Sequence, residues 1–182
     1  MTVGDGGMSH SYQKSQDPIG PDHTASATVT AIDGVNLVQF PQVPFAHGHI
    51  SEIYNLSWSQ MFGEPVEHMY FLSNLSRERQ EWYEHKVTKD RYVLVQGELE
   101  LALFDGRETS PTFRMFERLQ LRGISTVHDE PHGIIIPPGV WHSLRNISDS
   151  TLIMNFKTPG YARMNPDKYR IEMPNELCDF NW

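Results

Sequence analysis

Apolar and β-branched residues occur in short runs along the chain from residue 29 onward, and Gly, Pro or Asp separates most of these runs. Short strands at regular spacing, bounded by turn residues, are typical of a β-sandwich or barrel. The pattern therefore predicts an all-β fold. The expected strands are Val29–Val38, His49–Leu56, His68–Leu75, Tyr92–Gln96, Leu99–Phe104, Met115–Leu121, Gly133–Ile136 and Thr151–Phe156.

The two ends of the chain depart from this pattern. Residues 1–28 are rich in Gly, Ser, Asp, Pro and Gln, and they hold too few large apolar side chains to offset the entropy lost on ordering. We expect them to form a flexible tail or arm. Residues 157–182 contain several prolines and are expected to be irregular, with a short helix starting near 164–170. A chain of 182 residues then leaves one domain over 29–182.

Residues 137–146, PPGVWHSLRN, combine a tight turn with a histidine. Gly139 permits the positive φ of such a turn, and the two preceding prolines stiffen it. The strand that follows then starts with a known face, so we expect His142 to point inward. The spacing P-x-G-x-x-H-x-x-x-N resembles the second sequence motif of the cupin barrels.

Residues 82–97, WYEHKVTKDRYVLVQG, resemble the first cupin motif, in which two histidines one residue apart precede an acidic residue and a strand that ends in Gly. His85 is the second histidine and Asp90 the carboxylate, while Tyr83 takes the place of the first histidine. The β-rich runs on either side of Gly97 are expected to form a hairpin. Together the two motifs imply a cupin barrel, also called a double-stranded β-helix or jelly roll.

Three longer stretches resemble the dTDP-4-dehydrorhamnose 3,5-epimerase family of cupins. They read GHISEIY at 48–54, LVQGELELALFDGRETSPTF at 94–113 and IPPGVWHSLRNISDSTLI at 136–153. They are similar in order and separation to the R-G-x-x-x-E, S-P-T-F and I-P-x-G-x-x-H segments of that family, and they cover most of residues 35–165. The resemblance implies an isomerase of deoxysugar or surface polysaccharide biosynthesis that binds a nucleotide-linked 4-keto-hexose and needs no cofactor or metal.

In that family a histidine removes a proton next to the ketone, a lysine steadies the enolate oxygen, and a tyrosine returns a proton from the opposite face. Counted without gaps from Gly97 and His142, these positions are Tyr83, Asp90 and Asn155 in this chain. Tyr is a poor base near neutral pH, Asp repels an enolate, and Asn cannot deliver a proton. The substitutions predict weak or absent double epimerisation.

Other residues offer substitutes for these roles. His85 and His142 are candidate bases, and Tyr161 is a candidate acid because it lies six residues beyond Asn155. A nucleotide diphosphate is bound by cations and bidentate guanidinium groups, and the family uses a Glu on its first strand. The expected substrate-binding residues are His47, Glu52, Arg79, Asp90 and Arg91.

Three alternatives fit the same residues. His85 and Lys86 resemble the last two positions of the H-A-H-K motif in related 3,4-ketoisomerases. The three substitutions also fit a catalytically silent cupin that binds a sugar. A metal-dependent cupin would use His85, Asp90 and His142, a two-histidine, one-carboxylate set suited to Fe(II), Mn or Zn.

Composition narrows the possible partners. The formal net charge of −8 argues against nucleic acid and acidic membranes, which require a basic surface. The single cysteine, Cys178, excludes an internal disulfide and suits a reducing compartment. There is no apolar run of membrane-spanning length and no signal pattern. We therefore expect a cytoplasmic protein. The family resemblance also implies a homodimer, because small barrels of this family pair strands across a two-fold axis and an exposed strand edge must be covered.

Overall fold

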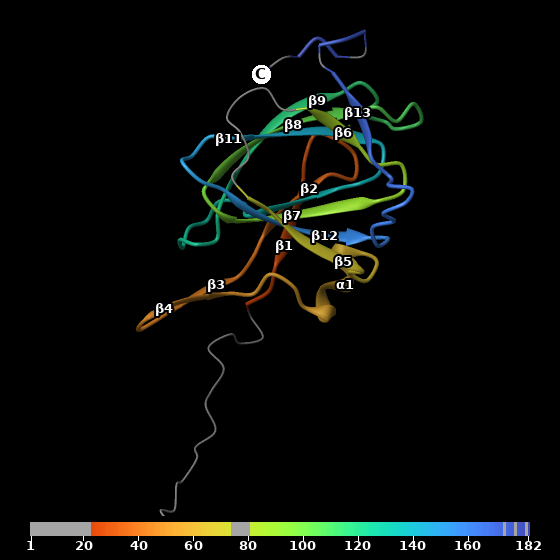
Figure 1. Ribbon diagram of the computed structural model, residues 1–182. Helices are drawn as coiled ribbons and strands as arrows, with labels where there is room; N and C mark the ends of the chain where they lie inside the picture. The colour runs from red at the N-terminus through yellow and green to blue at the C-terminus, as the bar shows by residue number, and fades with distance from the viewer. Residues whose placement is uncertain (1–22, 74–80, 173, 177, 181) are drawn as a thin grey trace, which may run out of the picture.

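A computed structural model describes residues 23–73, 81–172, 174–176, 178–180 and 182 of the chain. Two antiparallel sheets face each other and form a barrel, so the predicted all-β class is confirmed (Figure 1). The six-stranded sheet has the order β1-β2-β10-β7-β12-β5, and the five-stranded sheet has the order β13-β6-β11-β8-β9. The strands are β1 (Ser26–Val29), β2 (Asn36–Gln39), β3 (Gln42–Phe45), β4 (Gly48–Ser51), β5 (His68–Ser73), β6 (Trp82–Glu84), β7 (Lys89–Gln96), β8 (Glu98–Asp105), β9 (Phe116–Arg122), β10 (Gly133–Ile136), β11 (Val140–Asn146), β12 (Leu152–Thr158) and β13 (Tyr169–Ile171).

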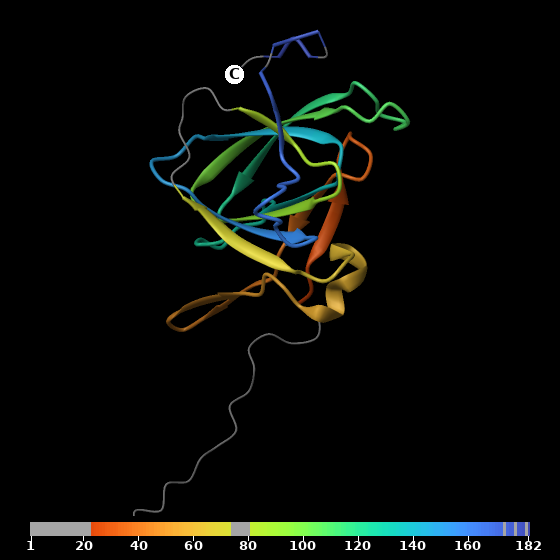
Figure 2. The same ribbon diagram turned by 45° about the vertical axis from the view of Figure 1, so that its right-hand side comes forward.

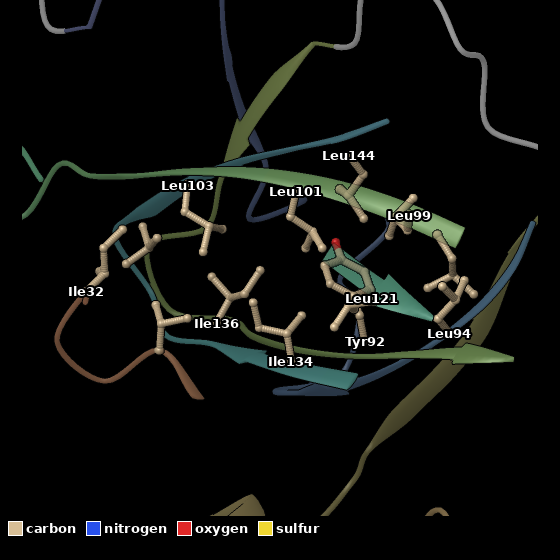
Figure 3. Packing of buried hydrophobic residues seen from close by; sticks show 13 residues of the cluster. Ile32, Tyr92, Leu94, Leu99, Leu101, Leu103, Leu121, Ile134, Ile136 and Leu144 are labelled. Carbon is tan, nitrogen blue, oxygen red and sulfur yellow. The ribbon is translucent and has the colours of Figure 1, made fainter. Parts of the chain in front are cut away.

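The main hydrophobic core lies between the two sheets (Figure 3). Leu99, Leu101 and Leu103 alternate along β8, so all three side chains point to the same face of the strand. They meet Ile134 and Ile136, which extend from β10 in the opposite sheet. All five side chains are almost completely buried. Burial on this scale is the dominant favourable term in folding, and here it holds the two sheets together.

Gly97 does not close a hairpin, contrary to the expectation from the sequence. β7 belongs to the six-stranded sheet and β8 to the five-stranded sheet, so Gly97 carries the chain from one sheet to the other. Its φ of +88° favours glycine, and a Cβ atom there would collide with the carbonyl oxygen of Ser150. β7 pairs with β10 and β12 instead. The two strand signals were correct, but strand pairing is not encoded locally.

Three other expectations need correction. The run Val29–Val38 is not one strand, because a turn at 30–35 separates β1 from β2. The run His49–Leu56 is strand only to Ser51, and a short 3-10 helix, η1 (Leu56–Trp58), begins at its end. Residues 164–170 form no helix, and β13 in this region pairs with β6. Of the expected tail, the structure describes residues 23–28, whose last three residues belong to β1.

A hairpin of β3 and β4 projects from the barrel (Figures 1 and 2). His132 joins its base to the barrel: the ring Nδ1 accepts a hydrogen bond from the Phe40 amide at 3.2 Å, and Nε2 lies 3.1 Å from Gln42 Oε1 on β3. These partners require the neutral ring with its proton on Nε2. Burial lowers the pKa of His132 to about 4, with a further contribution from His128.

Helix contributes little to this fold. α1 spans four residues, Ser59–Phe62, and packs beside η1. Within the described part of the chain, no helix is long and apolar enough to cross a membrane.

Candidate functional site

A cavity of about 440 Å³ is bordered by side chains from both sheets. β5, β7 and β12 contribute to it from the six-stranded sheet, and β6 and β11 from the five-stranded sheet. Most of the polar groups that border it are imidazole, phenol and ammonium groups. The lining residues are His68, Tyr70, Leu72, Glu81, Tyr83, His85, Tyr92, His142, Leu144, Lys157, Tyr161 and Lys168.

His142 points into this cavity, as its place after the proline-glycine turn predicts. Gly139 has a φ of +84°, and β11 begins at the next residue. The ring Nδ1 donates to the carbonyl oxygen of Val140 at 3.1 Å, so Nε2 is directed toward Asp90 Oδ2 at 3.3 Å. The side chain is almost fully buried. The turn and the local hydrogen bond therefore fix which nitrogen faces the site.

His85 reaches the same point from the residue after β6. Its Nδ1 donates to the carbonyl oxygen of Asp167, so Nε2 faces the interior. That nitrogen lies 3.1 Å from Lys157 Nζ and 3.2 Å from Asp90 Oδ2. In the neutral ring Nε2 carries a lone pair, which accepts from the ammonium group of Lys157. Once it has taken up a proton, the same nitrogen can donate to Asp90.

Asp167 holds the segment that orients His85. Its carboxylate accepts hydrogen bonds from the backbone amides of Lys86, Val87 and Thr88 at 2.9, 3.0 and 2.8 Å. Burial alone would raise the pKa of Asp167, but these hydrogen bonds lower it to about 2. The carboxylate is thus ionised at neutral pH and joins the C-terminal segment to the turn between β6 and β7.

Asp90 is the centre of the polar network. Its side chain is 1% exposed, and Oδ1 lies 3.0 Å from Lys157 Nζ and 2.9 Å from Asn155 Nδ2. Burial alone would raise the pKa of Asp90, but hydrogen bonding to His142 and His85 and the charge of Lys157 hold it well below its usual range. The carboxylate is therefore a permanent negative charge between the two histidines and the lysine.

The same residues do not fit a divalent metal ion. His85, Asp90 and His142 offer ligand atoms within 4.8 Å of one another, which is the set that the metal-dependent alternative requires. Lys157 Nζ, however, lies within 3.1 Å of both Asp90 Oδ1 and His85 Nε2. A metal ion between these ligands would stand against an ammonium group in a buried site, where like charges repel strongly. The lysine therefore neutralises the carboxylate that such an ion would need and competes with the ion for His85.

Tyr83 lies directly opposite His142 in the β6–β11 ladder. Its hydroxyl donates to Glu81, and Lys168 Nζ lies 3.9 Å from the centre of its ring. Burial and the neighbouring Glu81 carboxylate raise the pKa of Tyr83 to about 12. Such a group does not serve as a base near neutral pH, which agrees with the analysis of the sequence.

Tyr161 and Asn155 differ in position: Tyr161 borders the cavity and Asn155 does not. Tyr161 lines the cavity, is half exposed and stacks on His68 with ring centres 5.9 Å apart. Asn155 lies behind the cavity wall and is fully buried. The side-chain Nδ2 of Asn155 donates to Asp90 and to the Tyr70 hydroxyl. Its side-chain Oδ1 accepts a hydrogen bond from the backbone N–H of Arg91 at 3.1 Å.

Asp90, which is buried behind the lining residues, and three other expected substrate-binding residues do not line the cavity. The Arg91 guanidinium is buried and donates to Phe62, Glu64 and Thr158. Glu52 accepts from the Asn55 amide at 2.8 Å, and His47 is exposed in the turn between β3 and β4. Arg79, the remaining candidate, lies outside the described residues.

The lining residues that sequence reasoning missed include Tyr70, Tyr92, Lys157 and Lys168. A signal for Lys157 was present, because it lies two residues after Asn155 on one strand and therefore shares its face. Tyr70 and Tyr92 lie within predicted strands, and nothing in their local sequence separates them from core residues. Lys168 lies in the irregular C-terminal segment, where no periodicity applies.

The chain is similar in sequence to two proteins of glycan or polysaccharide biosynthesis. It is 26% identical over 137 residues to the probable low-salt glycan biosynthesis epimerase Agl13 of Haloferax volcanii. This alignment covers 74% of this chain and 84% of the relative. It is 31% identical over 103 residues to the spore coat polysaccharide biosynthesis protein SpsL of Bacillus subtilis, covering 54% of this chain and 62% of that protein. The chain matches no protein-family model.

Several solved structures have a similar fold. The crystal structure of the 3,5-epimerase RmlC from Legionella pneumophila in complex with dTDP-4-keto-L-rhamnose has a TM-score of 0.73 at 16% identity, covering 87% of this chain and 83% of that chain. The 4-keto-6-deoxy sugar epimerase NovW from Streptomyces spheroides has a TM-score of 0.72 at 16% identity, covering 93% and 83%. A dTDP sugar isomerase from Desulfovibrio desulfuricans has a TM-score of 0.69 at 23% identity, covering 82% and 90%. The predicted cupin fold and the predicted resemblance to deoxysugar epimerases are confirmed.

Proposed function

We propose that this cupin, a relative of the deoxysugar epimerases, is an isomerase that binds a nucleotide-linked 4-keto-hexose and moves a proton on a carbon next to the ketone. The observation that carries the proposal is the pairing of His85 and Lys157, whose Nε2 and Nζ atoms lie 3.1 Å apart in the cavity. A base and a cation are the two groups that enolate formation requires. The relatives act on sugars or in polysaccharide synthesis, which supports the choice of substrate.

The spacing of the two groups suits a ketone and its neighbouring carbon. A carbonyl oxygen and the adjacent carbon are roughly 2.4 Å apart, given bond lengths of about 1.23 and 1.52 Å. In this proposal Lys157 donates to the ketone oxygen while His85 removes the proton from the carbon beside it. Because both side chains are buried, the ammonium group stabilises the enolate more strongly than it would in water.

Asp90 supports both groups. Its carboxylate holds Lys157 in the cavity at 3.0 Å, and it lies 3.2 Å from the nitrogen of His85 that accepts the proton. The negative charge stabilises the imidazolium form of His85 after proton transfer. Asp90 therefore acts through the lysine and the histidine and does not face the enolate itself.

The family pattern places its lysine at position 90, where this chain has Asp90. The register of the strands explains how the site nevertheless contains a lysine. Lys157 is the direct partner of Asp90 in the β7–β12 ladder. Directly opposite residues of an antiparallel pair point to the same side of the sheet. The ammonium group therefore enters the cavity from the neighbouring strand. We expect measurable turnover, in contrast to the weak or absent activity that the three substitutions alone predict.

Solvent exchange tests the proposal. With dTDP-4-keto-6-deoxyglucose in D₂O, we expect the wild-type protein to incorporate deuterium at C3 or C5, as followed by NMR. His85→Gln and Lys157→Met should each lower the exchange rate by about 100- to 10,000-fold, because they remove the base or the oxyanion partner. Lys89→Met is the matched control, since Lys89 pairs with Glu64 and does not line the cavity. Absence of exchange in the wild-type protein across a panel of nucleotide-linked 4-keto sugars would contradict the proposal, and a 3-keto product would indicate the ketoisomerase alternative.

We also propose that the protein forms a homodimer through β5. This strand lies at the edge of the six-stranded sheet, so one row of its backbone groups is available for pairing. It also exposes Met69 and Phe71, each 52% accessible, on one face. A second copy related by a two-fold axis would cover both the edge and these apolar side chains.

A further inference from the structure

Four tyrosine side chains line the cavity: Tyr70, Tyr83, Tyr92 and Tyr161. An epimerase removes a proton from one face of the sugar ring and needs a donor on the other face to return it. A good donor has a hydroxyl hydrogen available to the ligand and neighbours that stabilise the phenolate left behind. The four tyrosines differ clearly in both respects.

Tyr83 and Tyr92 do not meet these conditions. The Tyr92 hydroxyl donates to Asp90 Oδ2 at 3.2 Å, and the Tyr83 hydroxyl donates to Glu81. Loss of either proton would leave a phenolate beside a carboxylate, which is electrostatically unfavourable. Burial and the Asp90 charge accordingly hold the pKa of Tyr92 well above its usual range.

Tyr70 differs in its hydrogen bonds, because its hydroxyl does not donate to a carboxylate among the described residues. Its hydroxyl oxygen accepts a hydrogen bond from Asn155 Nδ2 at 3.0 Å, and Lys157 Nζ lies 5.8 Å from the centre of its ring. Among the described residues, none accepts the Tyr70 hydroxyl hydrogen, so this hydrogen is available to a ligand in the cavity. Burial and, to a smaller extent, the Asp90 charge raise the pKa of Tyr70, while the charge of Lys157 and the hydrogen bond from Asn155 act against this rise.

The strand register links Tyr70 to the position where the family pattern places its tyrosine. Asn155, which occupies that position, lies directly opposite Tyr70 in the β5–β12 ladder. The same relation joins Asp90, at the lysine position, to Lys157. In both cases the required group stands on the neighbouring strand, and the substituted residue hydrogen-bonds to it.

Tyr70 and His85 extend from opposite sheets of the barrel. Tyr70 belongs to β5 in the six-stranded sheet, whereas His85 follows β6 in the five-stranded sheet, and Figure 1 shows these two strands on opposite sides of the barrel. The cavity is bordered by side chains from both sheets. A sugar ring between Tyr70 and His85 would present opposite faces to the two side chains. Tyr161, by contrast, is half exposed and stacks on His68.

We propose that Tyr70 is the catalytic proton donor of this site and that Asn155 positions it, an inference that rests on the proposed function. His85 takes the proton as the C–H bond breaks, and the electron pair moves onto the ketone oxygen held by Lys157. The enolate then collapses, its carbon takes the hydroxyl proton of Tyr70 from the opposite face, and a phenolate remains. Water restores the proton to Tyr70 and accepts the one held by His85.

Tyr70→Phe tests this inference, because it removes only the hydroxyl and keeps the ring. In D₂O we expect epimerised product to fall by about 100- to 10,000-fold. Deuterium should still enter substrate of unchanged configuration, because His85 removes and returns a proton on one face. Tyr169→Phe is the matched control and should form product at the wild-type rate, because Tyr169 is half exposed on β13 and does not line the cavity. Tyr161→Phe tests the alternative donor, and we expect it to keep most of the product formation.

Each other outcome has a distinct meaning. Wild-type product formation by Tyr70→Phe, or loss of product in Tyr161→Phe alone, would overturn the assignment while leaving the proposed function intact. Joint loss of product and of exchange in Tyr70→Phe would also overturn it, because a donor acts after the proton is removed. Absence of exchange in the wild-type protein would refute the proposed function itself, and the inference with it.

Discussion

At the scale of single residues, His132 makes the stability of the protein depend on pH. The pKa of this buried ring is lowered to about 4 in the folded protein from an ordinary value of 6.5. The unfolded chain therefore binds a proton more readily, and the free energy of unfolding decreases as the pH falls from 6.5 to 4. The difference corresponds to a loss of up to about 3 kcal/mol.

His132→Gln should remove this dependence while keeping both hydrogen bonds, because the side-chain amide offers an acceptor oxygen and an NH₂ donor group and does not titrate. Urea unfolding at pH 7.5 and pH 5 measures the effect. We expect a smaller loss of stability between the two pH values in the variant than in the wild-type protein. Equal losses would show that His132 does not titrate in this way.

At the scale of elements, the C-terminal segment supports the site through Asp167. Its carboxylate binds three successive backbone amides beside His85, and its carbonyl oxygen fixes the His85 ring. Because the pKa of Asp167 is lowered to about 2 from 3.8, this contribution to stability is present above pH 4 and is lost as the pH falls toward 2.

Asp167→Ala removes both carboxylate oxygens, and with them three hydrogen bonds, and should reduce stability by about 1–3 kcal/mol. It should also lower the rate of solvent exchange into the keto sugar, because His85 loses its fixed orientation. Asp129→Ala, in an exposed part of the loop between β9 and β10, serves as the control for loss of one carboxylate. A stable variant with wild-type exchange would show that the segment does not orient the base.

At the scale of the whole molecule, the exposed edge of β5 predicts a dimer. Sedimentation at micromolar concentration should give twice the mass of one chain for the wild-type protein. Phe71→Glu places a charge on the apolar face of β5 and should shift the protein toward the monomer, because a charge buried without a partner is unfavourable. A wild-type mass near that of one chain would contradict the dimer.

The sequence by itself determined those features that depend on neighbours along the chain. Runs of apolar residues with turn residues between them predicted the all-β fold, and the turn at Gly139 predicted the inward direction of His142. The motif around His85 and Asp90 correctly placed both residues beside His142. Turn conformation and the alternation of faces along a strand are local properties, and a linear pattern therefore records them.

Only the tertiary structure decided which strands lie side by side. Gly97 looked like the turn of a hairpin, yet β7 and β8 belong to different sheets. The partnerships of Asp90 with Lys157 and of Asn155 with Tyr70 follow from ladder registers between strands that are distant in sequence. Register is set by how the whole core packs, and a shift by one residue would turn each of these side chains to the opposite face. The lysine and the tyrosine of the candidate site therefore emerged from the packing of the two sheets and not from any motif.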